Sequence, residues 1–579
     1  MVADLNPDEP ASDDTGWPLR SWGLALLGAL VGLAIYNIAD VGTNHWSEDA
    51  TRLALASFLS TAGIAFAFTV ERDRIKGSAI FALVAGLVVA SVLYWSGDFT
   101  SWEPWRLVSA LLTIAIAAPL FQAWRDGGSV KWHIPYVETH NRAWTNVCLW
   151  FATWAFVGLV FLLAWLLAAL FNLIGIDALE ELLKKSWFAM MLAGASFGGA
   201  CGLLRDHERI VRLLQRVIMI VLSVLAPVLA VGLVIFLLAL PFTGLHALWE
   251  TTKSTTPILL SCVIGALILA NAVIGDKPED EAKLRPMRWS AMALGIAILP
   301  LGIIAAISTG LRIQQYGLTP ERLWAVTFTA IACAYGLAYL VALARGREAG
   351  WTGFVRPANM RLAVGLCALA FLLSTPLISF GALSTRNQIA RLEGGRTPVD
   401  KFDFAALRFE FGPAGVKALK ELAKEGKTEE IRKRAAIMLR YEDRFAAYRQ
   451  KERGEADDRA RIKKDRLREK ILVIPETAEL PDDIIDHIAH LSLCDLEEWP
   501  CNVLYRSEES EAIVFGRYGV TQIKNDGSKW RPTQKVDDPL SFDELRALSA
   551  AFKKGPVEIR PVVRRQLFID GKPVGQSFE

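Results

Sequence analysis

The sequence carries almost no net charge, because 63 Lys and Arg residues oppose 61 Asp and Glu residues, giving a formal charge of +2 at pH 7. Proteins that bind nucleic acid through bulk electrostatics neutralise many phosphates with an excess of basic side chains. We therefore expect no nucleic-acid partner. The charge is also unevenly divided, since the last 189 residues are about 38% charged and the first 390 about 14%. A soluble protein with one core does not segregate charge in this way.

Ionisable side chains are missing from the middle of the long apolar stretches in the first 390 residues. A bilayer-spanning helix needs about 20 apolar residues. Eleven candidate spans lie at about 21–38, 53–70, 77–95, 105–124, 144–173, 186–204, 217–240, 256–275, 289–309, 323–343 and 360–383. A charged group at mid-bilayer usually marks an ion or proton path. Its absence counts against a proton-coupled transporter built on a buried carboxylate.

Basic residues alternate between the connections that join these stretches. Five connections hold 18 Lys and Arg residues, and the five between them hold 6. Because cytoplasmic connections carry the excess of basic residues, the alternation predicts a cytoplasmic N-terminal tail and an extracytoplasmic C-terminal domain. The acidic N-terminal tail has no basic region typical of a cleaved signal peptide. Tryptophans such as Trp95, Trp144 and Trp324 lie at the ends of spans, as in an aromatic belt.

No catalytic constellation is visible in the spans. Gly194 to Gly198 matches G-x-S-x-G, but a nucleophile elbow requires a strand-to-helix turn, and this stretch is predicted to be helical. An intramembrane serine protease would need a histidine, and all seven histidines lie outside the spans. Gly194, Gly198 and Gly202 recur every four residues, which favours close helix packing. We expect no cofactor and favour a non-enzymatic protein.

Two predicted external connections carry polar residues that helix punctuation does not explain. In the second, Gly317 suits a bend, Thr319 an N-cap and Pro320 the first helical position. The residues left without such a role are Trp249, Glu250, Lys253, Arg312, Gln315, Tyr316 and Arg322. Together they could hold an anionic headgroup or glycan, or dock the C-terminal domain. The alternative is interfacial snorkelling and salt bridging.

Several segments carry a family resemblance. They are the two connections just described, Tyr136 to Asn146 running on through Leu170 to Ile176, and Asp403 to Gly412; the Gln-Tyr-Gly-Leu-Thr-Pro sequence at 315–320 is the most specific. Over residues 130–425 the chain resembles the bacterial inner-membrane family catalogued as domain of unknown function 4153. The resemblance implies a polytopic inner-membrane protein, and it supplies no activity, substrate or catalytic residues.

The remaining chain reads as juxtamembrane helices followed by a small folded domain. The fold class is mostly α, with a polytopic transmembrane helical bundle of about eleven spans followed by a soluble C-terminal α/β (α+β) domain. The expected parts are a tail at 1–20, the bundle at 21–383, juxtamembrane helices and a charged stalk at 384–470, and the α+β domain at 471–579. Strands are predicted at 471–474, 502–506, 512–517, 520–524 and 557–570, with helices at 481–493 and 541–553.

Two cysteines of the C-terminal domain permit alternative interpretations. Cys494 and Cys501 bracket a short turn, and a disulfide between them suits an oxidising compartment. Asp483, His487, His490 and Cys494 also fall on one helical stripe, and all four are possible zinc ligands. One straight helix rarely supplies four tetrahedral ligands, and the stripe could simply be the solvated flank of the helix. We therefore predict no metal site.

Two hypotheses of function follow. The first is a multi-pass bacterial inner-membrane protein that acts as an anchor, sensor or scaffold and presents its extracytoplasmic domain to an envelope protein. The second is a transporter or flippase for a lipid-linked or amphipathic substrate, such as a lipid or glycolipid, which enters through the external connections. The bilayer is a partner in both, and the oligomeric state is not determined by the sequence.

Overall fold

The computed structural model describes residues 17–39, 49–96, 104–127, 134–244, 255–441, 444, 467–468, 471–490, 501–516, 519–525, 527, 530–536, 547–548, 551–552, 557, 559, 565–569 and 572–578. The chain divides into two compact units, residues 1–444 and 445–579. Cys494, most of the charged stalk that was predicted to end at residue 470, and most of the helix predicted at 541–553 lie outside the described residues.

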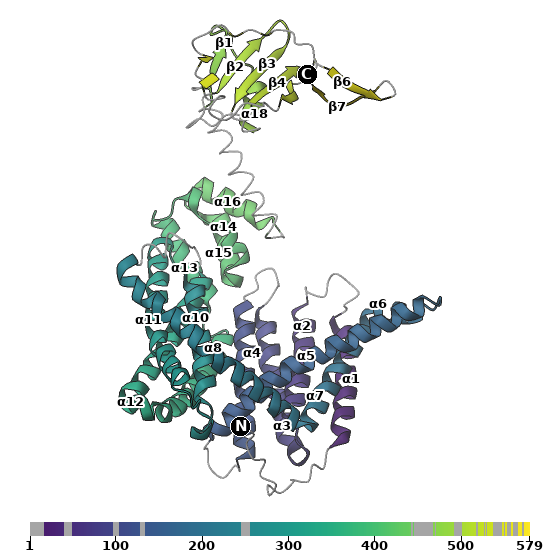
Figure 1. Cartoon of the computed structure of the whole chain (residues 1–579), viewed down its shortest axis with the longest axis vertical. Coiled ribbons are helices and arrows are strands. Elements are labelled where there is room, and N and C mark those ends of the chain that lie inside the picture. The colour runs from purple at the N-terminus through teal and green to yellow at the C-terminus, as the bar shows by residue number, and fades with distance from the viewer. Residues whose placement is uncertain are drawn as a thin grey trace. The chain divides into compact units, whose positions relative to one another are not determined.

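The first unit is a bundle of long apolar helices (Figure 1). Within the described ranges, eleven segments are long and apolar enough to cross a membrane, which confirms the predicted number of spans. The bundle comprises α1 (Pro18–Ala39), α2 (Ala50–Thr69), η1 (Arg72–Arg74), α3 (Ile75–Ser96), α4 (Pro104–Asp126), α5 (Tyr136–Asn172), α6 (Ala178–Lys184), α7 (Ser186–Asp206), α8 (Glu208–Thr243), α10 (Thr255–Ile274), η3 (Pro278–Asp280), α11 (Arg285–Tyr316) and α12 (Pro320–Ser374). The last of these contains two spans, because its backbone leaves the helical conformation at Arg347, where φ is 51°.

Glycines bring α1 and α7 into backbone contact, as the spacing of Gly194, Gly198 and Gly202 predicts. A Cβ atom added at Gly194 would lie 2.0 Å from the Gly28 carbonyl oxygen, and one at Gly198 would lie 2.0 Å from the Leu24 carbonyl oxygen. Any larger residue would force the helices apart. The sequence that matches G-x-S-x-G therefore packs two membrane helices together.

A second contact region holds α8, α10, α11 and α12 together. Its centre is fully buried and aliphatic, with Leu294, Ile298 and Leu301 of α11 at 0% exposure. In the same region the Tyr339 hydroxyl accepts a hydrogen bond from Asn271 Nδ2 at 2.8 Å. A buried hydroxyl of this kind requires such a partner. This core fills the space beside α10 between the two ends of that helix.

The last span ends earlier than predicted. We expected it to extend to residue 383, but α12 ends at Ser374 and a new helix, α13 (Phe380–Glu393), begins after Ser379. Pro376 explains the difference, because proline disfavours a helical conformation at the residue before it and cannot donate to the helix ladder. The Ser379 hydroxyl then caps the new helix by accepting a hydrogen bond from the Ala382 amide at 3.1 Å.

Short helices follow the spans and share a small core of their own. They are α13, η4 (Val399–Lys401), α14 (Phe404–Phe409), α15 (Gly412–Glu425) and α16 (Glu429–Leu439). Gly412, which has a φ of 67° and is followed by Pro413, marks the break between α14 and α15. Leu407 and Leu419 are fully buried where these helices meet.

The second unit contains a five-stranded sheet in the order β1-β2-β3-β4-β5. The strands are β1 (Leu472–Ile474), β2 (Asn502–Arg506), β3 (Glu511–Gly516), β4 (Gly519–Asn525) and β5 (Trp530–Val536), and β6 (Arg565–Ile569) pairs with β7 (Lys572–Phe578) as a separate hairpin. The β1–β2 pair is parallel and the others are antiparallel. Helix α18 (Asp482–His490) buries Ile484 and Ile488 in the core of this unit.

Candidate functional site

The Gln-Tyr-Gly-Leu-Thr-Pro segment is the tight turn between α11 and α12. Gly317 ends α11 with a φ of 78°, a left-handed conformation that glycine adopts without strain. The Thr319 side chain caps α12 by accepting a hydrogen bond from the Arg322 amide at 3.4 Å, and Pro320 occupies the first turn. The predicted punctuation is confirmed at all three positions.

Side chains of α13 hold this turn by its backbone. Gln388 Nε2 donates to the carbonyl oxygens of Tyr316 and Leu318, both at 2.9 Å. Asn387 Oδ1 accepts from the Leu318 amide at 2.9 Å, and Arg391 donates to the Gln315 carbonyl at 2.7 Å. The turn thus fixes the juxtamembrane helices to the ends of two spans.

A pocket of about 710 Å³ opens beside this turn. Its walls come from the start of α10, the end of α11, the start of α12, α13, and the segment from Arg396 to Phe411, which contains η4 and α14. The basic residues in the lining are Arg312, Arg322, Arg391, Arg396 and Lys401, and the acidic ones are Glu321, Asp403 and Glu410. Basic side chains therefore outnumber carboxylates in the pocket.

Two features make the pocket suitable for an anion. Helices α10 and α12 both begin at its wall, and the amide groups at a helix N-terminus carry a partial positive charge. The Arg322 guanidinium donates to the Gly317 carbonyl at 2.6 Å and lies 5.5 Å above the Tyr316 ring. These contacts hold an arginine and an aromatic side chain together at the rim.

The structure brings together four of the residues singled out in the sequence. Arg312, Gln315, Tyr316 and Arg322 all line the pocket. The other three, Trp249, Glu250 and Lys253, lie outside the described residues. The pocket residues that the sequence did not indicate are Gln388, Arg391, Arg396 and Lys401. Arg391 and Arg396 lie on the two sides of the Gly394–Gly395 pair, which is the local feature of the sequence near these residues.

The sequence model of the family described as Domain of unknown function (DUF4153) matches residues 54–422. The chain belongs to this family. The match begins in α2 and ends in α15, so it covers the turn, α13 and the whole lining of the pocket. No curated protein and no solved structure matches the chain.

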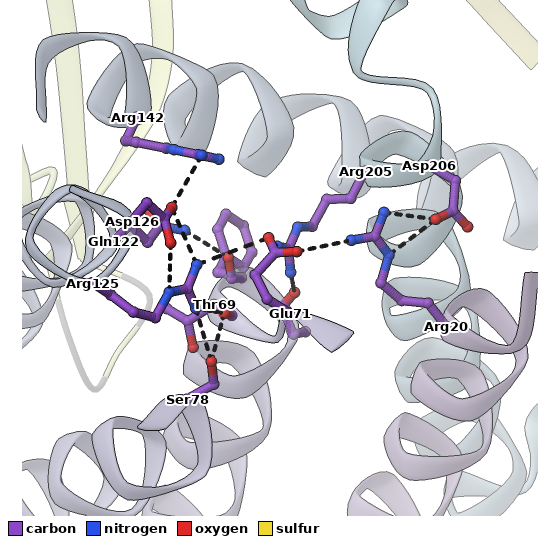
Figure 2. Close-up of polar contacts among 12 residues, drawn as sticks. Arg20, Thr69, Glu71, Ser78, Gln122, Arg125, Asp126, Arg142, Arg205 and Asp206 are labelled. Atoms are coloured by element: carbon purple, nitrogen blue, oxygen red, sulfur yellow. Dashed lines mark hydrogen bonds and ion pairs between the residues drawn. The ribbon is translucent and has the colours of Figure 1, made fainter. Parts of the chain in front are cut away.

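A second group of charged residues lies around the end of α2 (Figure 2), and all of its defining members except Arg20 fall within the matched family region. The Glu71 carboxylate forms an ion pair with the Arg205 guanidinium at 2.6 Å. The guanidinium groups of Arg125 and Arg20 lie 3.9 and 4.0 Å from the same carboxylate. Arg20 also pairs with Asp206 at 2.6 Å. The side chains of Arg20, Arg125 and Arg205 are only 6–10% exposed.

Two of these arginines, Arg125 and Arg205, cap the last carbonyl groups of α2. Arg205 donates to the Ala67 oxygen at 2.8 Å, and Arg125 donates to the Thr69 oxygen at 2.5 Å. Gln122 donates to the Phe68 oxygen at 2.8 Å. The last carbonyls of a helix have no partner within the helix and carry partial negative charge. This arginine network, defined by Arg20, Glu71, Arg125, Arg205 and Asp206, is therefore a structural cap.

The metal and disulfide residues of the second unit are described only in part. The His487 ring hydrogen-bonds to the Trp530 carbonyl, and Asp483 lies on the same helix. The His490 side chain and Cys494 lie outside the described residues. Cys501 is fully buried and disulfide-bonded. The pairing of Cys494 with Cys501 remains a prediction.

Proposed function

We propose that this integral membrane protein is a non-enzymatic anchor and sensor of the bacterial inner membrane. Its N-terminus is cytoplasmic, and its C-terminal unit is presented to a protein partner in the envelope. The main support for this proposal is that residues from the ends of the spans and from the juxtamembrane helices line the same pocket. A ligand bound there would contact both the membrane bundle and the segment that leads to the C-terminal unit.

The lining supports an anionic, amphipathic ligand. Basic residues exceed acidic ones, and two helix N-termini face the same space. Tyr316, Phe402 and Phe411 add aromatic surface to the lining. Nearby, the Trp324 ring packs against Trp105 in a tilted arrangement and against Phe380 edge to face, at centroid distances of 5.8 and 5.0 Å. Aromatic side chains are enriched in this way at the membrane interface. A lipid or glycolipid headgroup with a phosphate or carboxylate combines these properties.

The position of Asp403 and Lys401 suggests how binding would be transmitted. Asp403 Oδ1 accepts from the Ala406 amide at 3.1 Å and so caps α14. Lys401, two residues earlier, lines the pocket. An anion held by Arg396 and Lys401 would order the connection between α13 and α14. Ligand occupancy would then change the stability of the juxtamembrane helices, which is the response a sensor needs.

Transport of an amphipathic substrate is the second candidate, and one observation favours it. Another polar cleft, lined by Ala272, Gly275 and Asp276, opens at the opposite end of α10 from the pocket. The fully buried core of α11 lies between the two ends of this helix. A transporter would have to open that core, whereas an anchor and sensor would keep it packed.

The decisive experiment is purification of the full-length protein in native-lipid nanodiscs, followed by mass spectrometry of the co-purifying molecules. We expect the Arg396→Gln/Lys401→Gln double variant to retain one equivalent of anionic lipid or glycolipid fewer than the wild type. The matched control is Arg386→Gln, an exposed arginine of α13 outside the pocket lining. Retention of the lipid in the double variant, or equal loss in the control, would contradict the assignment of the pocket.

Two further measurements separate the candidates. An anchor and sensor predicts that removal of residues 445–579 abolishes the cellular phenotype and leaves lipid retention intact. A transporter predicts that purified protein moves labelled lipid across vesicle membranes and that Arg312→Ala and Arg322→Ala stop this movement at unchanged abundance. If the wild-type protein moves lipid and these two variants do not, the protein is a transporter and the sensor proposal is wrong.

A further inference from the structure

A polar cleft of about 750 Å³ lies at the end of the bundle where α5 and α8 begin and α10 ends. It is separate from the pocket beside α13 and shares no lining residue with it. Arg205 is the one member of the arginine network among the residues that line it. The cleft opens at the ends joined by the most basic connections of the sequence.

The side chains lining the cleft change from charged to apolar along α5. Glu138 and Arg142 come first and pair with each other at 2.8 Å. One turn further into the membrane are Thr145 and Asn146, which hydrogen-bond to Gln215 and Gln122 at 3.1 and 2.9 Å. Leu149, buried at 2% exposure, follows after another turn.

The same order recurs along α8, which enters the membrane from the same end. Glu208 and Arg212 pair at 3.2 Å in the first turns. Gln215 and Arg216 follow, and then the lining becomes apolar at Met219 and Ile220. Along both helices the lining therefore changes from mostly charged and neutral polar residues to apolar ones, and on α8 the polar Ser223 follows the apolar pair. A glycerophospholipid presents that succession as phosphate, ester carbonyls and acyl chains.

The cleft is lined by five basic residues, Arg142, Arg205, Arg212, Arg216 and Lys277, and by four carboxylates, Glu138, Glu208, Asp276 and Asp280. Glu138 and Glu208 are paired with Arg142 and Arg212. Asp276 accepts a hydrogen bond from Asn141 at 2.8 Å. Over the part of the chain that is described, neither Arg216 nor Lys277 forms an ion pair, and both are exposed at the cleft. Basic residues between transmembrane helices at headgroup depth attract anionic lipids.

We propose that this cleft binds an anionic glycerophospholipid, with its phosphate between Arg216 and Lys277 and its acyl chains beside the apolar residues of α5 and α8. Leu213 and Val217 are 61% and 50% exposed next to Arg216 and provide the apolar surface outside the cleft. The site does not depend on the function proposed for the other pocket.

Native mass spectrometry of the delipidated full-length protein, titrated with phosphatidylglycerol or phosphatidylcholine, tests this assignment. We expect tighter binding of phosphatidylglycerol and a loss of about fivefold in affinity for each charge removed, so about 25-fold for Arg216→Gln/Lys277→Gln. Arg216→Lys retains the charge and should restore most of the affinity. Arg72→Gln changes an exposed basic residue near the end of α2 and outside the cleft, and it should leave the affinity unchanged.

Three outcomes would overturn the proposal. The first is equal affinity for phosphatidylcholine, and the second is an equal loss in Arg72→Gln. The third is complete displacement of the lipid by millimolar inorganic phosphate, which would identify a site for a free anion. Gel filtration and thermal unfolding of each variant establish that it is folded, and a loss of binding confined to the folded double variant supports the lipid site.

Discussion

The arginine network at the end of α2 and the pocket beside α13 use the same residue types to opposite effect. In the network, Arg20, Arg125 and Arg205 are nearly buried and converge on Glu71 and on helix carbonyls. In the pocket, Arg322 and Arg391 also bind backbone carbonyls, but Arg396 and Lys401 remain exposed. Within the described ranges neither of the last two forms an ion pair.

The buried arginines stabilise the fold, whereas the exposed basic residues are available to bind a ligand. A buried arginine costs free energy through desolvation, and only partners such as Glu71 and the Thr69 carbonyl offset that cost. An exposed arginine or lysine has no such requirement. Variants of the first kind should therefore affect folding, and variants of the second kind should affect binding. The predictions below test this division, beginning with the largest effect.

Arg125→Ala should lower the free energy of unfolding by about 3–5 kcal/mol, the usual cost of removing one partner of a buried ionic network. The Thr69 carbonyl and the Ser78 hydroxyl would each lose a donor, at 2.5 and 3.0 Å in the wild type. Unfolding by SDS titration in mixed micelles measures the change. Arg212→Ala is the matched control, because its pair with Glu208 is more than half exposed, and it should cost less than about 1 kcal/mol. Equal effects of the two variants would remove the distinction.

Gly317→Ala should destabilise the turn by about 1–3 kcal/mol, the cost of a non-glycine residue in a strained conformation. Gly317 has a φ of 78°, and an added Cβ would lie 2.6 Å from Arg391 Cδ and 2.8 Å from Asn387 Oδ1. Faster hydrogen exchange is expected in α13 and at Leu318. The neighbouring Gly310 is a suitable control, because a Cβ added there meets nothing within 4 Å. Unchanged exchange in Gly317→Ala would show that α13 is not held by this turn.

Local signals in the sequence predict one half of this site. Gly317, Thr319 and Pro320 specify the turn because each residue type suits its own backbone position. The partners on α13 could not be predicted in the same way. Gln388 and Arg391 lie about 70 residues further along the chain, and only the tertiary structure brings them to the turn. The arginine network shows the same limit, because basic counts indicate a membrane side but not that Arg125 caps α2.

The incorrect element predictions also have physical causes. Strand β5 was missed because Trp530 to Val536 is polar and contains Pro532, which normally argues against a strand. The sheet order places β5 at an edge, where proline is tolerated. The last span was extended too far because apolar residues continue past Pro376, and composition alone does not register the break. Long apolar stretches, by contrast, predicted all eleven described spans.

Arg396→Gln and Lys401→Gln should change the free energy of unfolding by less than about 0.5 kcal/mol each, as surface substitutions usually do. Both side chains are exposed, and their loss removes charge from the pocket without breaking an ion pair in the described part of the chain. Anionic-lipid retention should nevertheless fall, because each variant removes one positive charge and should lower the affinity of the pocket for the lipid about fivefold. SDS titration and lipid quantification on the same preparations provide the comparison. A large loss of stability would place these residues with the buried network.

The smallest expected effect concerns pH at the Asp276–Asp280 pair. A side-chain hydrogen bond to Asp276 raises the pKa of Asp280 above its ordinary value of 3.8. A carboxyl whose pKa is raised by folding contributes stability when protonated, and that contribution is lost as the pH rises through its folded pKa. The apparent melting temperature should therefore decline slightly above pH 3.8 as Asp280 ionises. Asp280→Asn retains a donor toward Asp276 at every pH and should remove the decline, whereas Glu279→Gln, an exposed neighbour in η3, should preserve it. The same slope in Asp280→Asn as in the wild type would assign the pH dependence to other groups.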